Sequence, residues 1–335
     1  MRIYPSLAEL PAQMPPTVAA IGNFDGVHRG HQEIIGRVRE RARVLDAQAI
    51  AVTFDPHPMA LLHPEQAPKL ITPMPERLRL LARTGLDATL VVPFTREFSR
   101  MSARQFAEGV LLRVLHVAEV HEGDSFRFGH DAAAGIAELE ALGAELGFGV
   151  VSHEALRVRG LTVSSSEVRR RVAAGQLSMA RAMLGRPFSI LSAPVRGRGV
   201  GTKLTTPTIN LAPYRELLPP DGVYVARVRI GQEARWFDAV ANAGSRPTFE
   251  GVGFAIEAHL LDGPPPVELT ERTPVELCFL MRLREERRFP SPEALRGQIL
   301  RDVERARRYF RGIAKLETRG DPPAGRLAKH SKTGT

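Results

Sequence analysis

Residues 22–31 carry the residue types and spacing that best indicate chemistry in this chain: Gly-Asn-Phe-Asp-Gly-Val-His-Arg-Gly-His. An apolar run over 18–21 precedes this segment, and apolar residues recur at helical spacing over 32–43, so the segment connects a strand to a helix. Backbone N–H groups at the N-terminus of a helix favour an anion. Glycine allows close approach, so His28 and His31 are candidate ligands of a nucleotide triphosphate.

The two histidines have other interpretations. Imidazole is a common metal ligand, so His28 and His31 also fit a metal site. A strand–turn–helix with glycines is common, and an isolated histidine is usually a polar loop residue. The bare spacing therefore leaves nucleotide, metal and structural roles open.

A second candidate segment, residues 161–169, reads Leu-Thr-Val-Ser-Ser-Ser-Glu-Val-Arg. Three hydroxyl groups stand where a helix should begin, and Arg169 follows one turn later. Serines at a helix start are usually an ordinary cap. Beside a nucleotide motif, the same hydroxyls and arginine suit phosphate groups.

Both segments resemble those of one family. Residues 22–31 resemble the Gly-x-Phe-Asp-Gly-x-His-x-Gly-His signature of nucleotidylyltransferases, specifically flavin adenylyltransferases, and residues 164–169 resemble the family's Ser-Ser-Thr-x-x-Arg motif, with Ser166 replacing threonine. The resemblance implies catalytic roles for His28, His31 and Arg169. It also implies that Arg169 and the three serines hold the outgoing pyrophosphate. It implies ATP binding by Gly22, Phe24, Asp25, Gly30, Ser164, Ser165 and Ser166.

Two further segments resemble flavin-binding regions of the same family. Residues 53–58 read Thr-Phe-Asp-Pro-His-Pro, and residues 123–129 read Gly-Asp-Ser-Phe-Arg-Phe-Gly. The resemblance implies that the flavin is bound by His57, Pro58, Asp124 and Ser125. The family usually has Asp or Asn where this chain has Ser125, and the neighbouring carboxylate of Asp124 can compensate.

The glycine-rich residues 197–203 do not form a phosphate-binding P-loop. The order is Gly-Thr-Lys rather than Gly-Lys-Thr, and the proline-bearing, β-branched residues 205–208 follow instead of a helix. Scattered motifs after them resemble riboflavin kinase in their order: the Pro-Thr-Ile-Asn of 207–210, Asn242 and the segment 255–259. That family has a small six-stranded barrel.

The kinase resemblance implies specific roles in the second half of the chain. Thr208 and Asn210 would ligate Mg²⁺, for which oxygen ligands are suitable, and Glu257 would be the catalytic base. Strand alternation places Glu257 on one face with its second neighbours, although a solvent-facing glutamate is the plain alternative. Thr202 and Thr205 stand where the family commonly has Arg and Gly.

Together the resemblances identify a bifunctional riboflavin kinase and FMN adenylyltransferase. They imply that the chain makes FMN from riboflavin and ATP, then FAD from FMN and ATP, with Mg²⁺ in both steps. Alternatives are a nucleotidylyltransferase for another substrate, a nucleic-acid-binding protein, or a chain whose kinase half only binds flavin. Another nucleotidylyltransferase would have no use for residues 187–290. A nucleic-acid-binding surface usually contains aromatic side chains, and this chain has only four Tyr and one Trp.

The elements that must position these residues follow from periodicity. Expected strands and helices alternate in the first half, which predicts a Rossmann-like parallel sheet covered on both faces. The strands are expected over 49–54, 88–92, 118–121 and 149–152, and the helices over 32–43, 76–83, 102–115 and 132–146. Because ligands bind beyond the carboxyl ends of such strands, the segments 22–31, 55–58 and 122–129 should converge.

The pattern changes near Gly185, where a short helix over 179–184 should end before a proline. Antiparallel barrel strands are expected over 222–230, 234–241, 255–261 and 275–283, and Ser291 should begin a last helix. The predicted organisation is therefore an adenylyltransferase domain over 1–185, a kinase domain over 186–312 and a disordered basic tail over 313–335.

Composition bounds the remaining classes. The 335 residues carry a net charge of +9, of which the segment 311–335 contributes +4, so the rest of the chain is only modestly basic and suits phosphate-bearing small substrates. No apolar stretch approaches the ~20 residues that span a bilayer. The single cysteine, Cys278, excludes an internal disulfide and favours a reducing cytoplasm. We expect small-molecule substrates, neither nucleic acid nor membrane as partner, and a monomer or weak homo-oligomer.

Overall fold

The computed structural model describes residues 1–195, 208–231, 235–248, 251–265 and 267–318. The contacts divide the chain into two compact units, Met1–Glu167 and Val168–Thr335. The division falls inside helix α7 (Ser165–Ala173). Each unit is described by itself.

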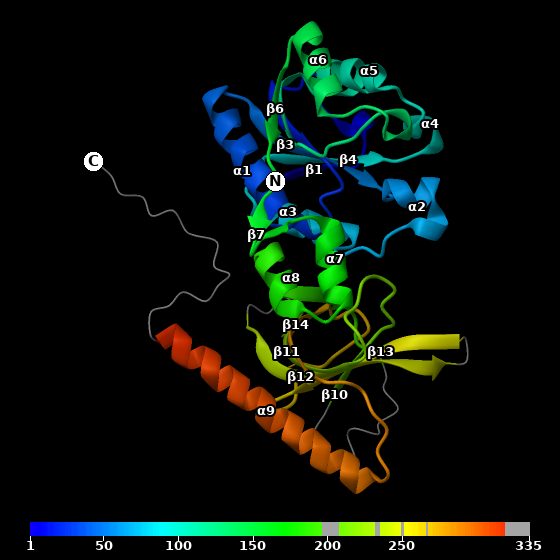
Figure 1. Ribbon diagram of the computed structural model, residues 1–335, viewed down its shortest axis with the longest axis vertical. Helices are drawn as coiled ribbons and strands as arrows, with labels where there is room; N and C mark the ends of the chain where they lie inside the picture. Colours follow the sequence, from blue (N-terminus) through cyan, green and yellow to red (C-terminus); the bar gives the residue numbers. More distant parts are fainter. Residues whose placement is uncertain (196–207, 232–234, 249–250, 266, 319–335) are drawn as a thin grey trace. The chain divides into compact units, whose positions relative to one another are not determined.

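The first unit is built on a six-stranded parallel sheet in the order β1-β4-β3-β2-β5-β6 (Figure 1). Its strands are β1 (Arg2–Tyr4), β2 (Thr17–Ile21), β3 (Gln48–Asp55), β4 (Ala88–Pro93), β5 (Val117–Gly123) and β6 (Gly149–His153). The central strand β2 is buried at every position, as expected of a strand covered on both faces. A small hairpin, β7 (Arg157–Val158) and β8 (Leu161–Thr162), stands apart from this sheet.

Helices cover both faces of this sheet and enclose two separate cores. On one face, α1 (Arg29–Val44) and α3 (Met74–Arg83) bury aliphatic residues such as Ile35 and Leu81. On the other face lie α5 (Ala103–Phe106), a π-helix (Ala107–Val114) and α6 (Ile136–Leu146), with Leu111 and Leu139 in their core. The short helices are α2 (Pro58–Leu62), α4 (Arg96–Ser99) and the 3₁₀ turns Leu7–Glu9, Asp25–Val27, Pro64–Gln66 and His130–Ala132.

The predicted α/β architecture is confirmed, and the differences are local. Strand β1 was not predicted because three residues carry no readable alternation. The helix expected over 132–146 begins only at Ile136, because Asp131 and Ala132 have left-handed φ values of 54° and 52°. The helix expected over 102–115 begins at Ser102 as predicted, but it widens to a π-helix after one turn.

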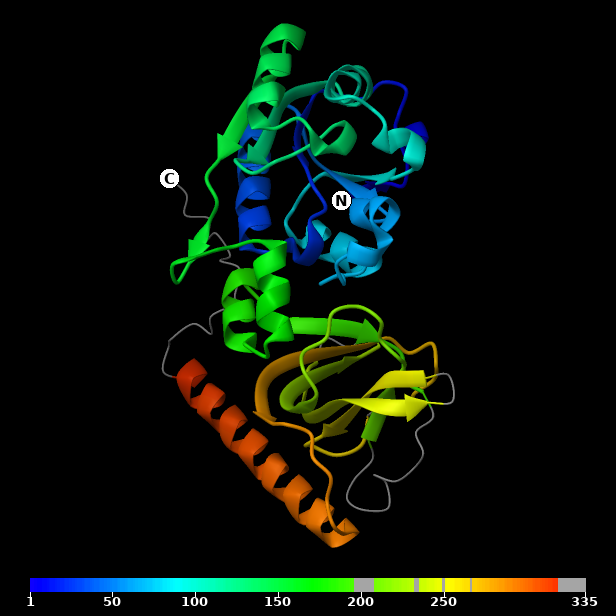
Figure 2. The same ribbon diagram turned by 45° about the vertical axis from the view of Figure 1, so that its right-hand side comes forward.

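The second unit contains a curled antiparallel sheet (Figure 2), whose six strands have the order β10-β13-β12-β11-β14-β9. Its strands are β9 (Phe188–Ser192), β10 (Thr208–Leu211), β11 (Gly222–Ile230), β12 (Phe237–Thr248), β13 (Gly251–Leu260) and β14 (Val275–Arg284). A bridge between Pro194 and Leu211 joins the two outer strands. The predicted six-stranded barrel with a terminal helix is confirmed.

Two helices accompany this barrel. Helix α8 (Leu177–Leu184) ends at Gly185, whose φ of 74° is the left-handed conformation that glycine adopts readily. Helix α9 (Pro292–Thr318) begins at Ser291, whose Oγ accepts the N–H of Ala294 at 3.2 Å. Its buried residues Ala306 and Phe310 pack with Val225 and Val240 of the barrel, and Figure 2 shows α9 running along the barrel's outside.

Candidate active sites

A cavity of about 1050 Å³ opens at the carboxyl edge of the parallel sheet. The strand order reverses between β2 and β5, and doubly wound sheets bind ligands at such a point. The lining residues that follow the strands include Gly22, Phe24, His28, Gly30, His31, Pro58, Asp124 and Ser125. The predicted convergence of the segments 22–31, 55–58 and 122–129 is therefore confirmed.

The turn after β2 has a backbone that few residues adopt. Gly26 and Val27 have φ values of 81° and 39°, and positive φ is rare for a β-branched residue. The buried carboxylate of Asp25 holds the turn, because it accepts the N–H of Ile71 at 2.9 Å and that of Thr72 at 2.8 Å. The hydroxyl of Thr72 in turn accepts the N–H of Gly26 at 2.9 Å. Asp25 thus shapes the loop and does not line the cavity.

His28 and His31 stack inside the cavity, with ring centroids 3.5 Å apart and planes 16° from parallel. His28 is also the N-cap of α1, since its Nδ1 accepts the backbone N–H of His31 at 3.3 Å. That acceptor role assigns the proton of a neutral His28 ring to Nε2. Gly30 makes the arrangement possible, because a Cβ there would lie 3.3 Å from two atoms of the His28 ring.

The ring of His31 has an unfinished hydrogen-bonding pattern. Its Nδ1 is buried and has no hydrogen-bond partner among the described residues. Burial, together with the neighbouring His28 and Arg77, lowers the pKa of His31 well below 6.5. Buried polar atoms nearly always have a partner, so a neutral, unpartnered ring nitrogen in a cavity indicates a group that a bound ligand completes.

The serine segment joins the same site at the start of α7. Ser164 caps the helix by accepting a backbone N–H at 3.2 Å, which is the structural role considered from sequence. The hydroxyl of Ser165 donates to the carbonyl of Asp25 at 2.9 Å and ties the helix start to the histidine loop. Ser164 and Ser165 line the cavity and Ser166 does not. Arg169 lies beyond the division between the two units.

The four candidate flavin ligands differ in position. Pro58, Asp124 and Ser125 line the cavity. His57 does not, and its Nδ1 accepts the N–H of Met59 at 3.2 Å as the N-cap of α2. His57 therefore fixes the start of α2, where Pro58 lies, and does not itself line the cavity.

Sequence reasoning missed an aromatic wall of this cavity. Besides Phe24 of the histidine loop, six phenylalanines line it: Phe54, Phe94, Phe98, Phe106, Phe126 and Phe128. They form a continuous chain of ring contacts, for example 5.8 Å between the centroids of Phe54 and Phe94. Phe126 and Phe128 stack with centroids 5.4 Å apart. The wall can accept a large, flat, apolar ring system, which favours aromatic contacts.

Sequence reasoning also missed a polar chain on the strands β5 and β6. The Nδ1 of His121 lies 2.9 Å from the Nε2 of His153, and His153 lines the cavity. The other ring nitrogen of His121, Nε2, lies 2.7 Å from Glu119 Oε1. Glu119 accepts from Arg41 of α1 at 2.9 Å. Burial is the main cause that lowers the pKa of both His121 and His153. This series of polar side chains therefore consists of two neutral imidazoles beside the Glu119–Arg41 ion pair.

The second unit presents a separate polar cluster. Thr208 and Asn210 lie on the same face of β10, and the register sets Asn210 opposite Glu257 and Thr208 opposite His259. Asn242 of β12 lies opposite Glu257 on its other side. Directly opposed residues share a face of the sheet, so the candidate metal ligands and the candidate base lie together.

Burial along β13 follows the predicted alternation. Ile256, Ala258 and Leu260 are buried, whereas Glu257 and His259 are half-buried on the other face. The glycine-rich residues 197–203, including Thr202, and Thr205 lie outside the described residues.

Comparisons with known proteins match both units. A family model described as FAD synthetase matches residues 10–167, and one described as riboflavin kinase matches residues 184–310. A bifunctional riboflavin kinase/FMN adenylyltransferase from Escherichia coli strain K12 is 36% identical over 298 residues, which cover 89% of this chain and 94% of that protein. The protein of the same description from Pseudomonas fluorescens is 37% identical over 308 residues, covering 92% and 97%.

A solved structure shares the fold of nearly the whole chain. It is described as a macrolide-efflux protein from Streptococcus pneumoniae, with a TM-score of 0.82 and 25% identity, and covers 92% of this chain and 99% of that one. In the part of this chain that the structure describes, no helix is both long and apolar enough to cross a membrane.

Proposed function

The chain belongs to the family of bifunctional riboflavin kinases/FMN adenylyltransferases, and from that premise we propose how its residues divide the work. The protein phosphorylates riboflavin to FMN and adenylylates FMN to FAD, using ATP in each step. The adenylyl transfer belongs to the cavity of the first unit and the kinase reaction to the barrel of the second. The stacked His28–His31 pair, with the orphaned His31 Nδ1, is the observation that carries this assignment.

In adenylyl transfer, an oxygen of the FMN phosphate forms a bond to the α-phosphorus of ATP. The bond from that phosphorus to the β-phosphate oxygen breaks, and pyrophosphate leaves. The attacking phosphate is already an anion, so no general base is required. His28 and His31 stabilise the phosphate oxygens whose charge grows in the transition state. Ser164 and Ser165, which line the cavity, hold the departing pyrophosphate together with Arg169 of the same helix, whereas Ser166 does not line the cavity.

The flavin ring of FMN occupies the phenylalanine-lined part of the same cavity. The six rings supply apolar surface and stacking partners for isoalloxazine, and Pro58 and Asp124 line the same cavity. The exposed Ser125 presents a hydroxyl where relatives of this family usually offer an amide or a carboxylate. The polar chain that ends at His153 gives the nucleotide side of the cavity fixed hydrogen-bonding groups.

In the kinase reaction, Glu257 accepts the proton of the ribityl 5′-hydroxyl as its oxygen attacks the γ-phosphorus of ATP, and ADP leaves. Thr208 and Asn210 carry neutral oxygens beside Glu257, which fits Mg²⁺, an ion often held by few protein oxygens together with substrate phosphates. When bound, Mg²⁺ would screen the phosphate charge. Thr208 and Asn210 would hold the metal beside Glu257, on the same face of the barrel.

Separate variants test the two assignments in the full chain. His31→Ala should lower FAD formation by about a hundredfold or more, because an electrostatic donor is lost, and should leave FMN formation from riboflavin intact. Glu257→Gln should do the reverse, by about a hundredfold or more for a lost general base. Chromatography of the flavins after incubation with riboflavin, ATP and Mg²⁺ measures both. If either variant lost both activities equally while folded, the two-site assignment would be wrong.

We further propose the setting in which these reactions occur. The functional boundary lies at Gly185, at the start of the region that the riboflavin kinase model matches and before the first barrel strand, β9. The enzyme acts in the cytoplasm on small molecules as a monomer or weak homo-oligomer, without nucleic acid or membrane as partner. The single, buried Cys278 supports the reducing compartment.

A further inference from the structure

Glu122 lies at the topological switch point of the parallel sheet and has no role so far. It is the penultimate residue of β5, is only 5% exposed and lines the cavity of the first unit. Its Oε1 accepts the backbone N–H of Ile21, the last residue of the neighbouring strand β2. The carboxyl group therefore stands where the two central strands end and the ligand cavity begins.

Strand alternation places Glu122 on the aromatic side of the sheet. Val120 shares its face, and it packs in the same core as Phe106 and Phe128, which also line the cavity. Glu119 points to the other face, where it accepts from Arg41 and is paired. The two glutamates of β5 thus have opposite surroundings, one beside an arginine and one among phenylalanines.

The buried surroundings of Glu122 favour the uncharged form of its carboxyl group. Desolvation raises its pKa well above 4.5, and the hydrogen bond from Ile21 only partly offsets this. Nine titratable or charged side chains besides Glu122 line the same cavity, and none of them contributes to the shift: His28, His31, Glu33, His63, Asp124, Arg127, Asp131, His153 and Glu154. In the protonated form that this burial favours, Oε1 accepts from Ile21 and the proton on Oε2 is available for donation.

A neutral donor among phenylalanines suits a neutral acceptor better than a phosphate. The isoalloxazine ring carries two carbonyl groups, and burying such a group without a hydrogen bond is costly. A carboxylate at this position would repel both a carbonyl oxygen and a phosphate. The histidines, in contrast, lie at the helix N-terminus on the phosphate side.

We propose that Glu122 is a positioning residue for FMN in adenylyl transfer, donating a hydrogen bond from its protonated carboxyl group to a carbonyl oxygen of the flavin ring. This inference rests on the proposed placement of FMN in the aromatic part of the cavity. The hydrogen bond from Glu122 gives the apolar wall one polar contact. This contact fixes the orientation of the flavin ring, and with it the distance from the FMN phosphate to ATP.

The test compares Glu122→Gln and Glu122→Met in the full chain, with KM for FMN and KM for ATP measured separately between pH 7 and pH 9. In this range the FMN phosphate stays a dianion, since phosphate monoesters lose their second proton near pH ~6. Glutamine keeps a neutral donor and the acceptor for Ile21, whereas methionine keeps the volume without either. Riboflavin phosphorylation in each variant checks that the second unit is unaffected.

We expect the wild-type KM for FMN to rise with pH as the carboxyl group ionises, while the KM for ATP stays level. Glu122→Gln should keep the low wild-type KM for FMN and abolish its rise. Glu122→Met should raise the KM for FMN by about tenfold at every pH, as expected when a buried acceptor loses its donor. A purely structural role would change both KM values together, and that result would overturn the proposal.

Phe126→Ala separates the role of Glu122 from the proposed placement of FMN, on which that role depends. Phe126 is a half-buried ring of the aromatic wall, and its loss should raise the KM for FMN if the flavin lies there. If Phe126→Ala raises this KM and Glu122→Met leaves it unchanged, the role of Glu122 is refuted and the flavin site stands. If neither variant changes it, the flavin site itself is misplaced.

Discussion

His28 and His31 can stack at 3.5 Å because the residue that precedes His31 has no side chain. Gly30 lies against the His28 ring, whose Nδ1 accepts the backbone N–H of His31 and is thereby held in place. The positive φ of Val27 directly before His28 is held by the buried Asp25. At the residue scale, several residues of the motif therefore serve to fix the positions of the two imidazole rings rather than to bind a ligand themselves.

Gly30→Ala tests whether the position of the His28 ring matters for activity. The added methyl group would lie 3.3 Å from Cε1 and Nδ1 of His28, so the ring must shift by a few tenths of an ångström. We expect FAD formation to fall by about tenfold or more, because small displacements of positioned groups are costly. FMN formation from riboflavin should not change, and both products are measured by chromatography.

Gly36→Ala is the matched control, since Gly36 lies on the same helix and, apart from its chain neighbours and the backbone of that helix, nothing lies within 4 Å of the added methyl group. It should retain FAD formation and stabilise α1 by ~0.5–1 kcal/mol, as alanine does in a helix interior. A Gly30→Ala enzyme as active as Gly36→Ala would show that the His28 ring position is not critical.

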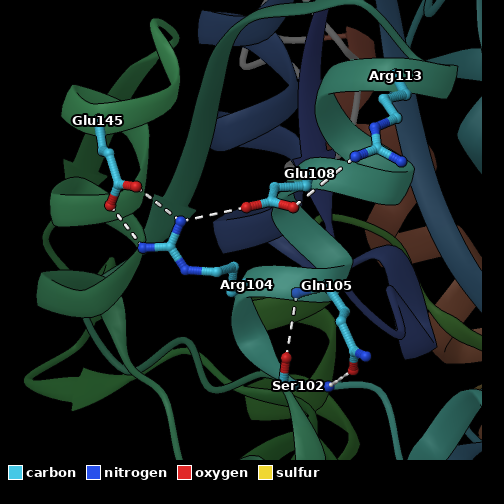
Figure 3. Close-up of polar contacts among 6 residues, drawn as sticks. All are labelled: Ser102, Arg104, Gln105, Glu108, Arg113 and Glu145. Atoms are coloured by element: carbon cyan, nitrogen blue, oxygen red, sulfur yellow. Dashed lines mark hydrogen bonds and ion pairs between the residues drawn. The ribbon is translucent and has the colours of Figure 1, made fainter.

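At the scale of elements, the helices on the aromatic side are held by contacts of unequal value. Figure 3 shows the capping box of α5, in which Ser102 Oγ accepts the N–H of Gln105 at 3.2 Å and Gln105 Oε1 accepts the N–H of Ser102 at 2.9 Å. It also shows Arg104 joined to Glu145 of α6 at 2.6 Å and to Glu108 at 3.2 Å. Arg104 and Glu145 are about half exposed, so solvent screens their attraction.

The cap should therefore matter more than the surface ion pairs. Ser102→Ala should lower the free energy of opening of this helix by about 1 kcal/mol, because it leaves a backbone N–H without its partner. Arg104→Ala should cause a smaller change despite losing two ion pairs. Hydrogen exchange of the amides over residues 103–114 measures both, and an equal or larger effect of Arg104→Ala would contradict this ranking.

At the scale of the whole molecule, each unit has its own core and its own site. The cysteine and the tryptophan of the chain, Cys278 and Trp236, both lie in the second unit, so thiol chemistry and tryptophan fluorescence report on the kinase half. Cys278 is buried in β14, as the sequence interpretation expected. Burial, reinforced by the neighbouring Glu276, raises the pKa of its thiol to about 12.

Cys278 should consequently be inert in the folded protein. With that pKa, only about one thiol in ten thousand is ionised at pH 8, and the thiolate is the reactive form. A disulfide reagent at pH 8 should modify no thiol in the native chain and one thiol per chain in denaturant. Rapid modification of the native protein would contradict the burial of β14 in the second unit.

Local sequence determined the elements well where periodicity was long or a cap was present. The bounds of β11 agree with the predicted 222–230, and α9 begins after its Ser291 cap. The alternation that sets Glu257 apart from its buried neighbours was readable because side chains in a strand alternate between faces. Short or irregular pieces such as β1 and the π-helix were missed, because tertiary contacts stabilise them rather than propensity.

The chemistry-bearing motifs, too, could be recognised from the chain alone, since the histidine loop and the serine segment are each contiguous. Only the tertiary structure decided that Asp25 anchors the loop from outside the cavity and that His57 caps a helix. It alone gathered six phenylalanines from distant segments into one wall and set Glu122 against the end of β2. The reason is physical: propensity and periodicity act between neighbours in the chain, whereas burial and desolvation depend on which strands lie side by side.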